Sequence, residues 1–479
     1  MKSDRGLSER ILKGPLALEV ARFGAPLALG MGLQTTFNLV DAYLIGRLPP
    51  DVAGPALGAI GICDQLAALG TIVSYGLSVA TGAIISRKYG EGDIEGVKSV
   101  AWQSLLMVLA LGGAFGILGV FGAEALMRDV VGAKGQVALL GARYLSVMIG
   151  GSFTIFLLLH LTTLQRALGS SKTPVTILIT ANAVNLFLAV LFVFGPGAAP
   201  AIVGWGPPLA EKLGVPRLEL MGAAWATLLA RLVVLFPLIL IVVHRFGLFR
   251  RPSRGRPDRD IMRAIWHIGW PSSTQLVVRI VAMLVIHSVV ARAYTTATNQ
   301  TATTALGIVF RLETMALFIG LGWGSAAQTF VGQNLGAANP LRAKVSGWYA
   351  ALFNAAMMAA LALAYQLWSR QIIAFFDPDP EVVAIGQSYV HWVAFSYIGL
   401  GVAIVLGAAI QGAGATRQTL VLDSLVVFAF QLPASWLVVF SLERSYERLW
   451  QVVALTYVAF AAVYWLSYRR GTFLRTVIA

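Results

Sequence analysis

An aspartate interrupts an apolar run of the sequence, TTFNLVDAYLIG at residues 35–46. Gln34, Asn38 and Asp41 are spaced four and three residues apart, so they share one face if this run is helical. A poorly hydrated environment favours the neutral form of a carboxyl, which lets the group bind a proton from one side of a barrier and release it to the other. The spacing therefore predicts a proton-exchange site centred on Asp41.

A later apolar run supplies the polar groups expected opposite this carboxyl. Asn182 and Asn185 are three residues apart and also share one helical face. We expect them to complete the coupling site around Asp41. Sodium is the alternative ion, because the carboxylate and amide oxygens could coordinate it together with Thr180 and backbone carbonyls.

Other charged residues lie within apolar runs and leave two interpretations open. Arg231 and Arg279 are expected near the middle of a membrane, together with Asp64. In the preferred interpretation each arginine pairs with Asp64 or with the aspartate of the coupling site. In the other, the arginines form an anion-binding cavity for a zwitterionic or acidic substrate. Arg311 and Glu313 are expected to pair with each other or with neighbours.

The remaining motifs argue against an enzyme. The sequence has no HExxH and no GxxxxGK[ST] pattern, which excludes two common metal-dependent and nucleotide-dependent sites. His160, His287 and His391 stand singly, without the spacing of metal ligands. We therefore predict no catalytic residues, no metal site and no cofactor other than the transported ion.

The composition predicts that membrane-spanning helices position these residues. Of 479 residues, 57% are hydrophobic and 12% charged, with a mean hydropathy of +0.76, whereas soluble domains carry about 25% charged residues. Apolar runs long enough to cross a bilayer recur along the chain. We predict twelve spans near 24–46, 54–79, 99–121, 141–165, 174–194, 222–244, 266–291, 303–327, 346–368, 387–411, 418–440 and 448–468.

The distribution of lysine and arginine predicts the orientation. These residues concentrate at both termini, in the even-numbered loops and in a linker at residues 244–263, HRFGLFRRPSRGRPDRDIMR. By the positive-inside rule both termini face the cytoplasm. The net charge of +14 then reflects topology and contact with anionic lipid headgroups rather than nucleic acid. The residues ahead of the first span are expected to form a short interfacial helix.

The chain also repeats itself. RFGAP at Arg22–Pro26 matches HIGWP at His267–Pro271. At nearly the same offset come further matches, which pair Gly76 with Gly322, Ala80 with Ala326, Gly90 with Gly336, Lys98 with Lys344, Tyr144 with Tyr389 and Gly169 with Gly414. Because each half holds an even number of spans, the halves insert in the same orientation. This predicts two six-helix bundles around a central cavity, a frame typical of alternating access.

These bundles give the predicted domain organisation. An N-terminal cytoplasmic segment covers residues 1–23, and the first six-helix bundle covers 24–244. An arginine-rich cytoplasmic linker covers 245–265, the second bundle 266–468, and a cytoplasmic tail 469–479.

Several motifs resemble those of the multidrug and toxic compound extrusion (MATE) family. They are VGQNLGAANPLRAK (331–344) with its counterpart SRKYGEGDIEGVK (86–98), LQRALGSSKTP (164–174), IQGAGATRQT (410–419) and the first span from Pro26 to Leu48. The resemblance implies a 6 + 6 exporter of the bacterial inner membrane, acting as a monomer, that exchanges a cation for a small organic compound. A DinF-like branch is one option within the family.

The sequence departs from the family pattern where carboxylates are common. Span 5 of the family often reads Asn-x-x-x-Asp, but Ala189 follows Asn185 here. The family's span 7 glutamate falls at or near Arg279, and span 10 has no acid. The loss of a second carboxylate favours protons over sodium. The alternative function is a flippase or exporter of an anionic substrate that uses Arg231 and Arg279.

Overall fold

The computed structural model describes residues 5–249, 257–296, 299–440 and 445–477. The side chains of residues 34–42 and of some positions in the next helix, Asp64 among them, lie outside the described part. Every regular element in the described ranges is helical. The first half comprises α1 (Arg5–Lys13), α2 (Leu16–Gly46), α3 (Pro50–Glu91), α4 (Ile94–Ala125), α5 (Gly135–Gly150), α6 (Ser152–Ala167), α7 (Lys172–Phe194), α8 (Gly206–Leu213) and α9 (Leu220–His244).

The second half has the same design. It comprises α10 (Arg259–Tyr294), α11 (Thr301–Gly336), α12 (Pro340–Phe376), α13 (Pro380–Val393), α14 (Tyr397–Gly412), α15 (Thr416–Val426), α16 (Leu432–Phe440) and α17 (Tyr446–Arg470). Among the described residues, eleven segments are long and apolar enough to cross a membrane, and α3 is the remaining long helix. The prediction of an all-helical membrane protein with twelve spans is confirmed.

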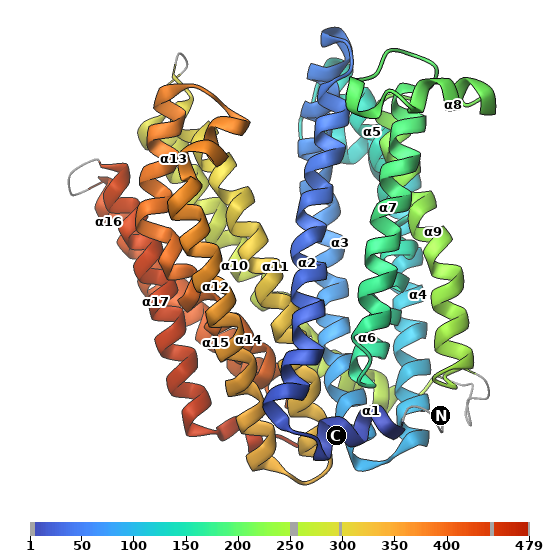
Figure 1. The fold of residues 1–479 in the computed structure, drawn as a ribbon, viewed down its shortest axis with the longest axis vertical. Helices are drawn as coiled ribbons and strands as arrows, with labels where there is room; N and C mark the ends of the chain where they lie inside the picture. Colours follow the sequence, from blue (N-terminus) through green and yellow to red (C-terminus); the bar gives the residue numbers. More distant parts are fainter. Residues whose placement is uncertain (1–4, 250–256, 297–298, 441–444, 478–479) are drawn as a thin grey trace.

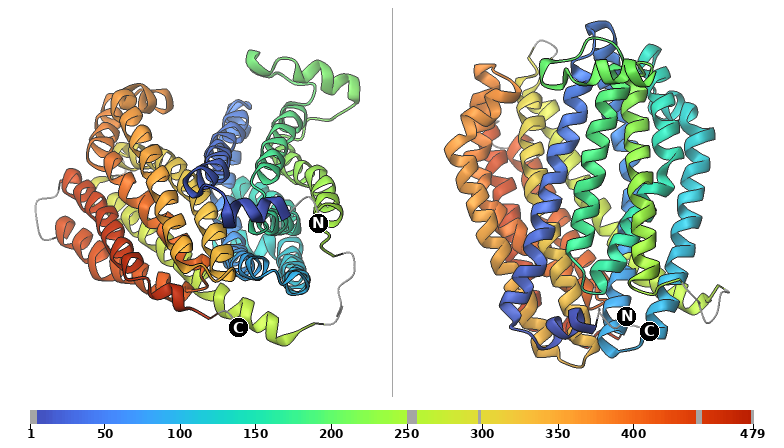
Figure 2. Two further views of the ribbon diagram at one scale, coloured as in Figure 1. Left: turned by 60° about the horizontal axis from the view of Figure 1, so that its bottom comes forward. Right: turned by 45° about the vertical axis from the view of Figure 1, so that its right-hand side comes forward.

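The helices form two bundles that meet at one end of the molecule (Figure 1). Helices α2–α9 make one group and α10–α17 the other, and both chain termini lie at the end where the groups converge. The two groups diverge toward the opposite end, which carries α8 (Figure 2). We call this converging end the terminal end.

In the described part of the chain, three spans are each built from two consecutive α-helices. Span 4 is formed by α5 and α6, which join at Gly151, and its counterpart span 10 by α13 and α14, which join through a 3-10 turn at Ala394–Ser396. Span 11 is interrupted by a π-helical turn, Val427–Gln431, between α15 and α16. π turns are rare and often occur at functional sites.

The contact between the bundles follows the sequence repeat. In the first half a Cβ on Gly76 would clash with the Gly269 carbonyl of α10. In the second half Gly322, the repeat partner of Gly76, lies equally close to Ala28 of α2. The two repeat-related glycines therefore contact counterpart helices, α10 and α2, across the interface, as expected for two bundles related by an axis along the membrane normal.

A second pair of glycines repeats this pattern closer to the terminal end. Gly90 of α3 lies against the Gln333 carbonyl of α11, and its repeat partner Gly336 lies against the Arg87 carbonyl of α3. Side chains at these positions would push two backbones apart, so glycine permits the close crossing of α3 and α11.

The turns after these helices are also related. Gly92 and Ala338 both have positive φ, +77° and +56°, a conformation that costs a non-glycine residue energy. Each precedes an N-cap: Asp93 accepts a hydrogen bond from the backbone N–H of Gly96, and Asn339 from that of Arg342. The Gly96 amide and the Lys88 ammonium hold the pKa of the Asp93 carboxyl below its usual range.

The expected short helix ahead of the first span is present as α1, lying across the terminal end (Figure 2). The Arg342 guanidinium at the start of α12 holds it there, because Nη2 donates to the Gly14 carbonyl at 2.6 Å and to the Ile11 carbonyl at 3.1 Å. The first long helix begins at Leu16, before the predicted start at residue 24, so the helix continues beyond the apolar run.

Candidate functional site

Helices α2 and α7 carry the predicted coupling site and pack side by side. A Cβ on Gly30 of α2 would lie 3.7 Å from the Val175 Cβ of α7. Both helices run from the terminal end toward the opposite end (Figure 1). Their backbones therefore bring residues 38–41 to the level of about 183–186.

Asn185 is half-buried on α7, and its Nδ2 donates to the Thr227 hydroxyl of α9 at 3.0 Å. Arg231 lies one turn further along α9, so it shares the face that meets Asn185, and it is half-buried. Asn182 is half-buried and Thr180 exposed. The predicted residues Gln34, Asn38, Asp41 and Asp64 lie outside the part of the chain whose side chains are described.

The second bundle gives Arg279 a partner that the sequence analysis did not consider. Arg279 Nε donates to Asp423 Oδ2 at 2.5 Å, and Nη2 donates to Oδ1 at 3.3 Å. For Arg279 the described partner is thus Asp423 rather than Asp41 or Asp64, whereas the predicted pairing of Arg231 stays a prediction. Asp423 was detectable by the rule that singled out Asp41, because it is an acid inside the apolar span 418–440.

Asp423 is completely buried, and a polar network holds its carboxylate. Tyr464 donates its hydroxyl to Oδ1 at 2.6 Å, and Gln275 donates from Nε2 to Oδ2 at 2.8 Å. Gln275 Oε1 in turn accepts from Gln411 at 2.8 Å. With this many donors, the free-energy cost of burying the carboxylate is compensated. The same network fixes the position of Arg279.

Glu313 of α11 forms a separate polar cluster. The Tyr389 hydroxyl donates to its Oε2 at 2.6 Å, and the Tyr457 hydroxyl donates to its Oε1. Of the two expectations for Glu313, pairing with neighbours holds, although the neighbours are tyrosines. Arg311 instead lies over the ring of Phe376, with 6.0 Å between Cζ and the ring centroid.

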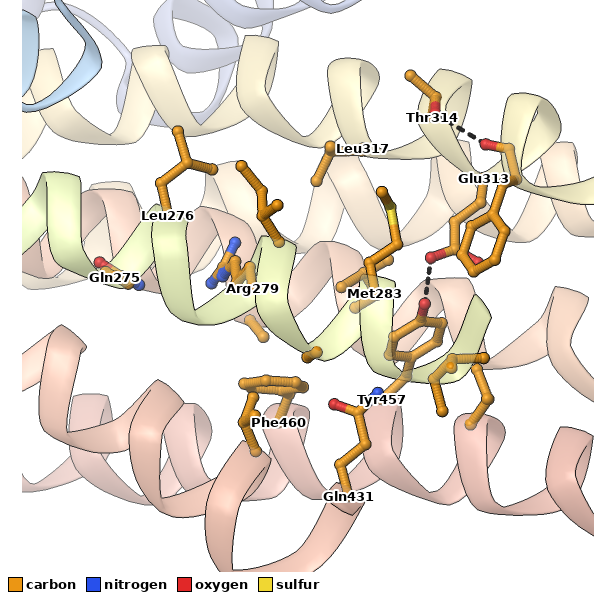
Figure 3. Close-up of a pocket in the computed structure, with 18 of the residues that line it drawn as sticks. Gln275, Leu276, Arg279, Met283, Glu313, Thr314, Leu317, Gln431, Tyr457 and Phe460 are labelled. Carbon is orange, nitrogen blue, oxygen red and sulfur yellow. Dashed lines mark hydrogen bonds between the residues drawn. The ribbon is translucent and has the colours of Figure 1, made fainter. Parts of the chain in front are cut away.

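A cavity of about 320 Å³ joins these two clusters inside the second bundle. Figure 3 shows Arg279 and Glu313 at different positions along its length, with Met283 between them. Apolar side chains form most of the wall, and Tyr75 of α3 reaches the cavity from the first bundle. Among the described residues, no cluster of histidine, cysteine, aspartate or glutamate could hold a metal ion.

A family model described as MatE matches residues 26–191 and 275–437. The chain belongs to the MatE family. The resemblance inferred from the sequence motifs is confirmed.

Curated MatE-type relatives cover nearly the whole chain. The probable multidrug resistance protein YpnP of Bacillus subtilis is 26% identical over 96% of both chains. A protein named FAD transporter, from Shewanella oneidensis, is 26% identical over 90% of this chain and 89% of its own.

Solved MATE structures share the fold. A crystal structure of a MATE mutant has a TM-score of 0.85 at 22% identity and covers 98% of this chain and 99% of its own. A transporter of the MOP superfamily from Pyrococcus furiosus, whose reversed pocket polarity is said to suggest a different function, has a TM-score of 0.85 at 22% identity, with 98% of both chains covered.

Proposed function

We propose that this MatE protein is a secondary active exporter that exchanges protons for small organic compounds by alternating access. The observation that carries the proposal is the repeat-related crossing of the two bundles at the terminal end. Two bundles that meet at one end through repeat-related contacts can separate there and close at the opposite end, which is the motion that alternating access requires. The substrates are cationic or zwitterionic compounds, and the protein works as a monomer in the bacterial inner membrane with both termini in the cytoplasm.

Asp41 is the proposed proton carrier. The α2 and α7 backbones support this role, because they bring residues 38–41 level with the asparagines of α7. Protonation of the carboxyl would release a cationic substrate, and deprotonation would prepare the site for the next one. Asn38, Asn182 and Asn185 would hydrogen-bond the carboxyl in both states, and Gln34, about 10 Å away along α2, would extend the polar face toward the terminal end.

The test is transport in proteoliposomes with imposed proton or sodium gradients, using ethidium as the organic cation. A proton gradient should drive ethidium transport, and Asp41→Asn should abolish this coupled flux while leaving insertion intact. Asp260→Asn, at the exposed first turn of α10, should transport normally. Coupled transport by Asp41→Asn at the wild-type rate would reject the proposal, and flux driven only by the sodium gradient would replace the proton with sodium.

An exporter of anionic compounds is the second candidate. Arg279 lines the cavity of the second bundle, and one relative carries the name FAD transporter. In this case FAD, rather than ethidium, should be transported by the same proteoliposomes and should stimulate proton flux.

A further inference from the structure

The cavity of the second bundle carries one basic and one acidic group at separate levels. Gln275, Arg279 and Met283 follow one another at intervals of one turn along α10, about 6 Å each. Met283 lies between Arg279 and Glu313 in Figure 3, and no described salt bridge joins these two charged groups; the described ion pair of Arg279 is with Asp423. Neither group neutralises the other directly, and a ligand that reaches both must be elongated.

At the basic end, Asp423 holds part of the Arg279 guanidinium, and another part is exposed to the cavity. Arg279 uses Nε and Nη2 for Asp423, and no described hydrogen bond uses its Nη1. The Arg279 side chain keeps 24% of its surface exposed, whereas Asp423 keeps none. A guanidinium offers five N–H donors in a planar fork. The exposed part of this guanidinium therefore suits the oxygens of a carboxylate.

Among the described residues, the acidic end has no cationic partner. The carboxylate of Glu313 accepts from Tyr389 and Tyr457, which are neutral hydroxyl donors, and no described salt bridge involves it. A carboxylate has about four lone-pair positions, so two tyrosines leave acceptor capacity toward the cavity. An ammonium group placed there would supply the missing positive charge.

The wall between the two ends is apolar. Leu276, Met283, Leu317 and Phe460 line it, and the π-helical turn Val427–Gln431 directs both of its end residues to the same cavity. A volume of about 320 Å³ is at the lower end of the roughly 300–1,000 Å³ found for small-molecule pockets. The cavity accordingly suits a compact organic body with a charge at each end.

We propose that this cavity binds an amphipathic zwitterion, with its carboxylate on Arg279, its ammonium on Glu313 and its apolar body between them. The inference rests on the proposed export function and assigns it a substrate class and a site in the second bundle. A ligand with only a carboxylate would leave Glu313 without a cation, and a ligand with only an ammonium would leave the exposed part of Arg279 without an acceptor; both losses reduce affinity.

The experiment is calorimetric titration of the purified full-length protein with three matched probes. 4-(2-Aminoethyl)benzoate carries both charges, 4-(2-aminoethyl)benzamide only the cation, and 4-propylbenzoate only the anion. The zwitterion should bind at least about tenfold more tightly than either singly charged probe, the ratio set by one charge-assisted contact. Equal affinities for the three probes would overturn the proposal.

Substitutions test which residue binds each charged end of the ligand. Glu313→Gln should reduce affinity for the zwitterion to that of the anion-only probe, whereas Glu447→Gln, at an exposed position of α17, should not. Arg279→Lys keeps a positive charge for Asp423 but lacks the planar fork, so it should reduce affinity for both carboxylate probes. Arg292→Lys, exposed on the same helix α10, is its control. Unchanged probe ranking in Glu313→Gln would also overturn the proposal.

Transport measurements separate this proposal from the export function. Proton-driven ethidium transport that depends on Asp41, together with no zwitterion preference, would retain the exporter and reject the cavity site. Preferential binding of the zwitterion without proton-driven flux of any probe would retain the site and reject the exchange mechanism.

Discussion

At the residue scale, the Arg279–Asp423 pair shows how the second bundle holds a buried charge. Removing only the arginine would leave the fully buried Asp423 carboxylate without a cation. Arg279→Gln should therefore destabilise the protein by on the order of 3–5 kcal/mol. The effect should appear as a lower apparent Tm of the purified protein at a fixed heating rate.

The double variant Arg279→Gln/Asp423→Asn is the matched comparison. It removes both charges and keeps hydrogen-bonding groups at both positions, so its apparent Tm should lie above that of Arg279→Gln alone. If the double variant loses as much stability as Arg279→Gln and Asp423→Asn lose together, the two charges do not interact.

At the element scale, the crossing of α3 and α11 depends on glycine. A methyl group at position 90 would meet the backbone carbonyl of Gln333, and a backbone cannot rotate away as a side chain can. Gly90→Ala should therefore separate these helices and add a population with longer distances between the bundles. Spin labels at the exposed, repeat-related positions Glu95 and Leu341, in a Cys63→Ser background, allow pulsed electron resonance to measure it.

Two further substitutions check this result. Gly336→Ala should act in the same direction, because Gly336 faces the Arg87 carbonyl in the repeat-related contact. Gly54→Ala in α3 adds the same methyl group where no atom lies within 4 Å. An identical distance distribution for Gly90→Ala and Gly54→Ala would contradict the proposed crossing.

At the scale of the whole molecule, the proposed rocking requires the bundles to separate at the terminal end. A Cβ on Gly269 would lie 3.7 Å from the Ala80 Cβ, within the range of about 3.5–4.5 Å that a disulfide needs. In a Cys63→Ser background, Ala80→Cys/Gly269→Cys should crosslink α3 to α10. Transport in proteoliposomes should fall to background on oxidation and recover on reduction.

A crosslink within one bundle is the control. Gly30 and Val175 have the same Cβ separation, 3.7 Å, but both belong to the first bundle. Gly30→Cys/Val175→Cys should therefore leave transport intact when oxidised. Full transport by the oxidised Ala80–Gly269 pair would mean that the bundles need not separate at this end.

The sequence determined the helices, their number and the repeat, because these follow from local properties. The length of apolar runs decides which segments span a membrane. Small residues at equivalent positions, such as Gly76 and Gly322, reveal the duplication before any coordinates exist. Family membership also follows from such motifs, and the structure added that equivalent glycines of the two halves each contact the other bundle across the interface.

Only the tertiary structure decided which charged residues meet. Arg279 and Asp423 lie 144 residues apart in the chain, and Glu313 finds its tyrosines on two other helices. Helical periodicity gives the face on which a residue lies, but the rotation and tilt of neighbouring helices decide which faces oppose each other. Rotation and tilt follow from the packing of all the side chains in a bundle. The sequence therefore shows each charged residue of the cavity in the second bundle but does not show that these residues meet there.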